Sequence, residues 1–282
     1  MEPVEHQFLG LGLGGFHRLA YVSWGSDRAR PPVLCVHGLT RNGRDFDMLA
    51  ADLAWSGRTA VCPDVVGRGR SGWLANPALY GYPQYLADAA ALIARLDVAE
   101  VDWVGTSMGG LIGMMLAAQP NNPIRRLVLN DVGPFIPQAA LLRIGSYVGQ
   151  DPVFADLAEL EAYLRRVHAP FGSLTDGQWR HLAEHSARRR QDGTLGLAYD
   201  PGIAAAFAGP VADVDLWMVW DQIRCPVLVV RGAESDLLTA ATAERMAARP
   251  GTTLLTIPGC GHAPALMAAD QTGPIRDWLA AG

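Results

Sequence analysis

Short, mostly apolar runs that stop abruptly at turn residues constrain the fold of this chain more than any other feature. Each run is followed within two residues by Gly, Pro, Asn or Asp. The runs lie at residues 32–36, 59–62, 101–104, 124–129, 227–231 and 253–257. Continuous apolar runs without polar alternation suit strands that are covered on both faces, as in a parallel sheet.

Helical patterns separate these runs along most of the chain. They lie at residues 44–55, 85–96, 107–119 and 239–248, and a last helix is expected to end near Leu279. Strands that alternate with helices of this length imply βαβ units. The sequence therefore predicts the α/β class, with a mostly parallel, twisted sheet flanked by helices.

Residues 134–217 interrupt this alternation. They contain helical patterns at 157–167 and 178–190 and no obvious strand run. We therefore expect an α/β core domain made of residues 1–133 and 218–282, with a helical lid inserted at residues 134–217. A chain of 282 residues is long enough for one large domain with such an insertion.

Charge and apolar length argue against several classes of partner. The formal net charge is −5, and no basic stripe interleaved with aromatic residues is present, which argues against nucleic acid. The densest basic run, residues 188–190, is expected to be a solvated helix face. No apolar stretch approaches the length of a membrane span, and the acidic N-terminus lacks a signal-peptide core. We expect a cytoplasmic protein without membrane association, and its oligomeric state stays open.

The four cysteines are scattered and fit free thiols better than a disulfide framework. Cys35 and Cys62 lie in or beside apolar runs, Cys225 and Cys260 lie far from both, and no C-x-x-C spacing occurs. Free thiols are typical of a reducing compartment.

The pattern G-x-S-x-G occurs at residues 105–109 (GTSMG), between an apolar strand and an apolar helix. A Ser at such a corner is forced into a tight turn, and flanking glycines remove the side-chain clashes that this turn would create. The hydroxyl then stands exposed above the sheet. This context predicts that Ser107 is a catalytic nucleophile.

A Ser hydroxyl needs a base, and His262 is the best candidate among the seven histidines. His262 lies in a Gly-rich loop between the last strand and the last helix. The base in turn needs an orienting carboxylate. We predict Asp236, which follows the strand at 227–231. Asp131, which also ends a strand, and Glu234 are the rival carboxylates.

The tetrahedral intermediate of acyl transfer needs hydrogen-bond donors for its oxyanion. We predict the backbone N–H of Met108, because free N–H groups and the helix dipole at a helix start favour negative charge. The second predicted donor is the N–H of Leu39, in the loop after the first apolar run. His37, two residues earlier, is expected to hydrogen-bond within this loop without touching substrate.

Five motifs in order give the chain its resemblance to the α/β-hydrolase superfamily, in a branch that carries a lid. They are HG at 37–38, DVVGRGRS at 64–71, GTSMGG at 105–110, RGAESD at 231–236 and GH at 261–262. The resemblance covers nearly the whole chain and implies the α/β-hydrolase fold. It also implies that Asp64, Gly67, Gly69 and Ser71 have a structural role and no catalytic one. A Ser nucleophile in place of Asp separates the chain from haloalkane dehalogenases and epoxide hydrolases.

Two further motifs suggest cofactors and are interpreted otherwise. Residues 10–15 satisfy G-x-G-x-x-G, but residues 16–24 alternate like a strand, so we expect a β-turn and no dinucleotide. Residues 181–185 satisfy the zinc pattern H-x-x-E-H, but they lie in the expected lid with no further ligand suggested. We expect neither a metal nor an organic cofactor.

Two arginines lie near the expected cleft. Arg41 follows the predicted oxyanion loop, and Arg68 lies in the next glycine loop. Because ligands of open α/β sheets bind at the carboxyl ends of the strands, either guanidinium is a candidate to bind a carboxylate or second ester carbonyl. The alternative is that both pair with nearby acids and only brace the loops.

These observations together predict a serine hydrolase that cleaves small carboxylic esters through an acyl-enzyme. A C–C bond hydrolase of ring-cleavage products, a cofactor-free perhydrolase and a non-catalytic receptor on the same fold are the alternatives. Some apolar lid side chains should line the substrate pocket. They are drawn from Phe135, Ile136, Leu141, Leu142, Ile144, Tyr147, Val148, Phe154, Phe171 and Phe207.

Overall fold

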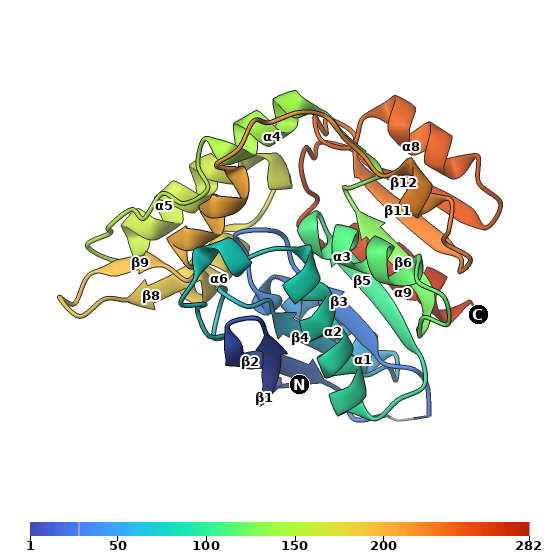
Figure 1. The fold of residues 1–282 in the computed structure, drawn as a ribbon, viewed down its shortest axis with the longest axis horizontal. Coiled ribbons are helices and arrows are strands. Elements are labelled where there is room, and N and C mark those ends of the chain that lie inside the picture. The colour runs from blue at the N-terminus through green and yellow to red at the C-terminus, as the bar shows by residue number, and fades with distance from the viewer. Residues whose placement is uncertain (28, 282) are drawn as a thin grey trace.

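An eight-stranded sheet with the strand order β1-β2-β4-β3-β5-β6-β11-β12 forms the centre of the molecule (Figure 1). The computed structural model describes residues 1–27 and 29–281. Strands β1 (Val4–Gly12) and β2 (Gly15–Trp24) form an antiparallel hairpin, and β2 pairs antiparallel with β4 (Ala60–Asp64). The glycine-rich residues 10–15 therefore lie in a hairpin, as the sequence predicts, with its turn at Leu13 and Gly14.

The rest of the sheet is parallel, as the apolar runs predict. Its strands are β4, β3 (Val33–Val36), β5 (Val101–Thr106), β6 (Ile124–Asn130), β11 (Val227–Gly232) and β12 (Thr252–Ile257). Their carboxyl ends meet at one edge of the sheet, where ligands of open α/β sheets bind. The chain thus has an α/β-hydrolase fold with a mostly parallel sheet.

Helices cover both faces of this sheet. Helices α1 (Asp47–Trp55) and α9 (Ala269–Ala280) pack on one face, and α2 (Tyr82–Leu96), α3 (Met108–Ala117) and α8 (Ala240–Ala247) pack on the other. Successive β3 residues divide between the two cores, since Leu34 packs with α2 and α3 whereas Cys35 packs with α1. This division follows from the two-residue period of a strand.

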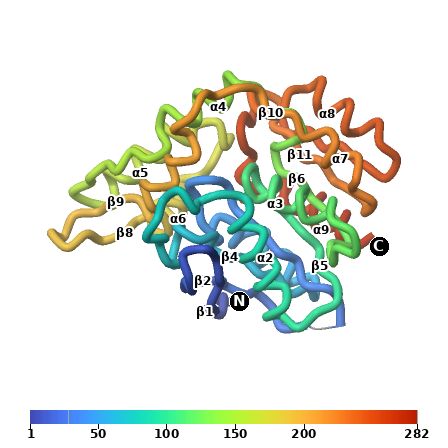
Figure 2. Tube along the Cα trace, in the orientation of Figure 1, coloured from blue at the N-terminus to red at the C-terminus, as the bar shows by residue number. Residues whose placement is uncertain are grey.

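The chain leaves the sheet after β6 and returns to it at β11. The helices in between are α4 (Gln138–Gly145), α5 (Leu157–Val167), α6 (Asp176–Ser186), α7 (Trp217–Trp220) and the 3₁₀ turns η3 (Ala169–Phe171) and η4 (Pro201–Phe207). The strands are β7 (Phe135–Ile136) with β10 (Val214–Asp215), and β8 (Ala187–Arg189) with β9 (Leu195–Leu197). Figure 2 shows the trace passing through α4 and α5 to the projecting β8–β9 hairpin before it returns to α7.

The two small sheets correct the expectation that this insertion holds no strands. The helix predicted over 178–190 ends at Ser186, and Arg188 and Arg189 lie in β8. Helix α6 ends because Ala187 adopts an extended backbone and pairs with Leu197. Residues 188–190 are therefore not a solvated helix face; Arg188, for example, stacks over the Trp73 ring.

Two other expectations concern cysteines and membranes. All four cysteines are free, as predicted. Within residues 1–27 and 29–281, no helix combines the length and the apolar character that a membrane crossing requires.

A buried carboxylate in β5 generates a stability prediction. Asp102 is fully buried and accepts hydrogen bonds from Arg58 at 2.5 Å and Arg125 at 2.6 Å. Arg58 is itself buried. Removing one partner of a buried ion pair leaves an uncompensated charge and costs about 3–5 kcal/mol. Asp102→Asn should lower the free energy of unfolding by about that amount, measured by urea titration.

The matched control is Asp52→Asn, which removes the partner of Arg276 in a partly exposed pair. Such pairs contribute at most ~1 kcal/mol, so this variant should unfold close to the wild-type midpoint. Equal losses in the two variants would contradict the dominant role of burial.

Candidate active site

Ser107 is the single residue between the end of β5 and the start of α3. Its backbone has φ 51° and ψ −114°, in the left-handed half of φ space that L side chains rarely adopt. A Cβ on Gly105 would lie 2.3 Å from the Gly109 carbonyl oxygen, and one on Gly109 would lie 2.0 Å from the Val36 carbonyl oxygen. The glycines of G-x-S-x-G are therefore required by how closely strand and helix approach.

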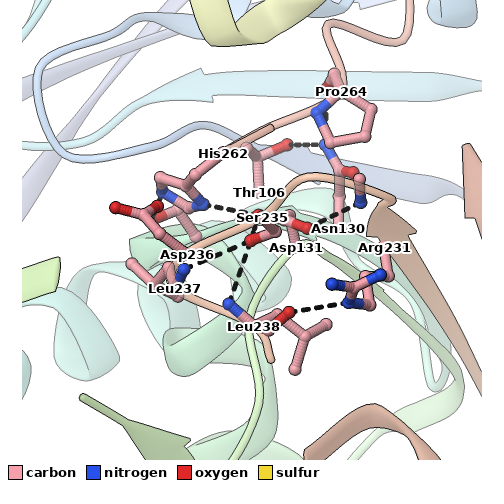
Figure 3. Close-up of polar contacts among 12 residues, drawn as sticks. Thr106, Asn130, Asp131, Arg231, Ser235, Asp236, Leu237, Leu238, His262 and Pro264 are labelled. Carbon is pink, nitrogen blue, oxygen red and sulfur yellow. Dashed lines mark hydrogen bonds and ion pairs between the residues drawn. The ribbon is translucent and has the colours of Figure 1, made fainter. Parts of the chain in front are cut away.

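His262 lies in the loop between β12 and α9 and connects two groups. Its Nε2 lies 3.0 Å from the Ser107 hydroxyl oxygen. Its Nδ1 lies 2.8 Å from Asp131 Oδ2 (Figure 3). Because a carboxylate only accepts, Nδ1 carries the proton and Nε2 accepts from the hydroxyl. This is the geometry of a nucleophile, a base and an orienting carboxylate.

Asp131 immediately follows β6 and is fully buried. Besides His262, its Oδ2 accepts from the Ser235 hydroxyl at 2.6 Å, and its Oδ1 accepts from the Gly232 N–H at 2.8 Å. Figure 3 shows Asp131, Ser235 and His262 meeting beside the end of β11. These donors stabilise a carboxylate that is shielded from water.

The prediction that Asp236 orients the histidine is wrong. The Asp236 side chain is 48% exposed and forms an ion pair with Arg143 of α4, at 2.5 and 2.8 Å. Glu234, the other rival in this loop, is also exposed. Because β6 and β11 are neighbours, the loops after both strands reach His262, and sequence order alone does not choose between them.

Ser235 is the site residue that the sequence interpretation missed. It lies in the same loop as Asp236, and its hydroxyl points the opposite way, toward Asp131. The only sequence signal for this role was a Ser between the two acidic residues Glu234 and Asp236.

The two predicted oxyanion donors lie on either side of Ser107. Leu39 and Met108 both line the cavity described below. A Cβ built on Gly38 would lie 3.7 Å from the Ser107 Cβ, so the loop that carries Leu39 passes directly beside the nucleophile. Neither amide donates a hydrogen bond to any group in the described part of the chain. Their role as oxyanion donors stays a prediction.

His37 braces two loops, as predicted. Its Nδ1–H donates to the Gly38 carbonyl at 2.7 Å, and its Nε2 accepts from the Val65 N–H at 2.9 Å. Burial lowers the pKa of His37 to about 4, so the ring is neutral near pH 7.

A cavity of about 550 Å³ opens beside Ser107. Its walls come from both the core and the insertion, which supplies Ile136, Leu141, Ile144 and Phe207 among others. No charged side chain lines it in the described residues. Its polar side chains are Ser107, Tyr80, Tyr82 and Tyr85.

Arg41 and Arg68 are not among the residues that line this cavity. Arg41 donates twice to Asp45, both at 2.8 Å. Arg68 is fully buried and donates to the carbonyls of Leu39 and Val66. The structure therefore favours the alternative, that both arginines brace the neighbouring loops, although Arg68 does so through backbone carbonyls and not through an acid.

The histidines of the H-x-x-E-H pattern meet an aspartate of the core. Asp47, His181 and His185 carry ligand atoms within 4.8 Å of one another. The Arg44 guanidinium donates to Asp47 at 2.7 Å, however, and His181 Nε2 donates to the Arg44 carbonyl at 2.9 Å. Arg44 therefore already uses a carboxylate oxygen of Asp47 and the Nε2 of His181.

Comparison with known proteins places this geometry in a family. A family model described as "Alpha/beta hydrolase family" matches residues 33–272, and the chain belongs to this family. The 3-hydroxybutyrate-oligomer hydrolase of Cupriavidus necator is 49% identical over 261 residues, covering 89% of this chain and 88% of that protein. The 2-(acetamidomethylene)succinate hydrolase of Mesorhizobium japonicum is 30% identical over 238 residues, covering 82% and 81%.

Solved structures agree with this assignment. The crystal structure of an alpha/beta hydrolase from Novosphingobium aromaticivorans has a TM-score of 0.89 and 36% identity, and the match covers 99% of both chains. The chain is thus similar to hydrolases over nearly its whole length, and it is an enzyme of the hydrolase class.

The position of Asp131 generates a kinetic prediction. Asp131→Asn should lower kcat for an activated ester on the order of 10⁴-fold, because the amide no longer holds the required imidazole tautomer. Asp236→Asn should change kcat by less than about tenfold, since an exposed ion pair contributes at most ~1 kcal/mol. The test is to measure kcat of both variants with the same ester. A larger loss of kcat in Asp236→Asn than in Asp131→Asn would restore Asp236 as the orienting acid.

Proposed function

We propose that this hydrolase cleaves carboxylic esters through a triad of Ser107, His262 and Asp131. The observation that carries the proposal is the unbroken hydrogen-bond chain from the Ser107 hydroxyl through His262 to the buried Asp131 carboxylate. Ser107, at one end of this series of hydrogen bonds, lines an apolar cavity that can accept an organic substrate.

In the proposed reaction, Ser107 attacks the ester carbonyl while His262 Nε2 takes the hydroxyl proton. Asp131 stabilises the imidazolium that forms. The N–H groups of Leu39 and Met108 receive the oxyanion, and α3 adds the positive end of its dipole. His262 then protonates the leaving alcohol, and water repeats the sequence on the acyl-enzyme.

The proposed substrates are short oligoesters of hydroxy acids. A relative with 49% identity is a 3-hydroxybutyrate-oligomer hydrolase, which acts on such esters. The cavity volume of about 550 Å³ suits a ligand of a few such units, and its aliphatic walls suit their methyl-bearing chains. We further propose that residues 134–217 act as the lid, because they supply much of this wall.

The nucleophile assignment is tested by Ser107→Ala. This variant should lose ester turnover and keep its thermal midpoint, because the hydroxyl supplies chemistry and not packing. A fluorophosphonate should add its mass to the peptide that contains Ser107 and to no other. Turnover near the wild-type rate, or labelling of another residue, would contradict the assignment of Ser107 as the nucleophile.

The reaction class is tested by a substrate panel. We expect hydrolysis of the 3-hydroxybutyrate dimer and trimer, with slower hydrolysis of long-chain p-nitrophenyl esters. A dienone ring-cleavage product is tested in parallel, and so is peroxide-dependent halogenation. Turnover of the dienone alone would indicate a C–C bond hydrolase, and binding without turnover of any compound would indicate a receptor.

A further inference from the structure

Three tyrosines form a polar strip in the otherwise apolar wall of the cavity. The Tyr80 hydroxyl donates to Asp200 at 2.6 Å and accepts from the Leu74 N–H at 2.8 Å. The Tyr85 hydroxyl accepts from Arg68 at 3.0 Å. These two hydroxyls are thus held by the protein itself.

Tyr82 differs from the other two. Its ring meets Tyr85 edge-on, with centroids 6.0 Å apart, but its hydroxyl has no hydrogen-bond partner in residues 1–27 and 29–281. Burial and the nearby Tyr85 raise the pKa of the Tyr82 phenol, so it keeps its proton near pH 7. Tyr82 therefore offers an unused donor to the cavity that it lines.

The backbone around Tyr82 adds a positive potential. Tyr82 is the first residue of α2, and the N-cap position, Gly81, provides no side-chain cap. Gly81 and Tyr82 both line the cavity, so the first turn of this fifteen-residue helix borders it. Pro83 has no N–H, and the N–H groups of Gln84 and Tyr85 donate to the Gly81 carbonyl. The contribution of this helix end is therefore the positive end of its dipole, which favours negative charge.

Arg68 supplies a second source of positive potential behind the tyrosines. Its guanidinium lies 5.7 Å from the Tyr80 ring centroid and 5.2 Å from that of Tyr85. Arg68 is fully buried and forms no ion pair with any carboxylate in the described chain. A buried cation without an acidic partner has a far-reaching field, because few mobile charges screen it.

We propose that the Tyr82 hydroxyl, in the first turn of α2, recognises the free carboxylate end of a hydroxy-acid oligomer. The inference rests on the proposed ester hydrolysis and adds a substrate preference to it. A 3-hydroxybutyrate oligomer carries its carboxylate a short carbon chain away from the last ester bond. Binding of that group at Tyr82 would place the last ester bond within the same cavity as Ser107.

The experiment compares Tyr82→Phe with the wild type on the 3-hydroxybutyrate dimer and on the methyl ester of that dimer. A hydrogen bond to a charged group is stronger than one to a neutral carbonyl. The ratio of kcat/KM for the free acid to that for the methyl ester should therefore fall about tenfold in Tyr82→Phe. The fall should appear mainly as a higher KM for the free acid.

Tyr80→Phe is the matched control, because its lost hydroxyl is already bonded to Asp200 and Leu74. It should keep the wild-type ratio. A ratio that stays within about twofold of wild type in Tyr82→Phe, while both substrates are hydrolysed, overturns this inference alone. An equal loss on both substrates also overturns it, because the hydroxyl would then serve a neutral carbonyl or packing.

Binding provides a readout that is independent of turnover. In the Ser107→Ala background, calorimetric titration with the 3-hydroxybutyrate dimer should give a Kd about tenfold weaker when Tyr82→Phe is added. An unchanged Kd would overturn the inference. If the wild-type enzyme hydrolyses no ester at all, the proposed function fails, and this inference fails with it.

Discussion

The arrangement of the site depends on the hydrogen bonds that the buried Asp131 carboxylate accepts. A buried charge must be matched by hydrogen-bond donors, and here they come from two other segments. Gly232 ends β11 and Ser235 follows it, and His262 follows β12. The ends of β6, β11 and β12 are thereby joined around one side chain. Parallel strands make this possible, because their carboxyl ends meet at one edge of the sheet.

The proposed nucleophile, Ser107, is placed by a second constraint, which is steric. Helix α3 approaches β5 so closely that Gly105 cannot carry a Cβ, and it approaches the end of β3 so closely that Gly109 cannot carry one either. His37 stabilises the adjacent loops through hydrogen bonds at both ring nitrogens, and burial keeps its ring uncharged. The hydroxyl is therefore held between a rigid corner and a braced loop, while the insertion contributes the facing apolar wall.

Much of this arrangement was predictable from the sequence, for identifiable reasons. Buried parallel strands leave continuous apolar runs, and the Ser107 corner demands glycines, so both were visible locally. The choice of Asp131 over Asp236 was not, because it depends on which of two adjacent strand ends faces the imidazole. The β8–β9 hairpin was also missed, since strands of three residues are too short to show a periodic apolar pattern. The tyrosine strip likewise required the fold before its three hydroxyls could be compared.

The loop after β11 carries two adjacent residues with opposite partners. Ser235 holds the carboxylate of the proposed triad inside the core, and Asp236 holds Arg143 of α4 at the surface. The peptide bond between Ser235 and Asp236 therefore links two contacts, one with Arg143 of the insertion and one with Asp131. Dissolved salt weakens the exposed contact far more than the buried one. A change in ionic strength would therefore act one residue away from the proposed catalytic triad, without any ion entering the cavity.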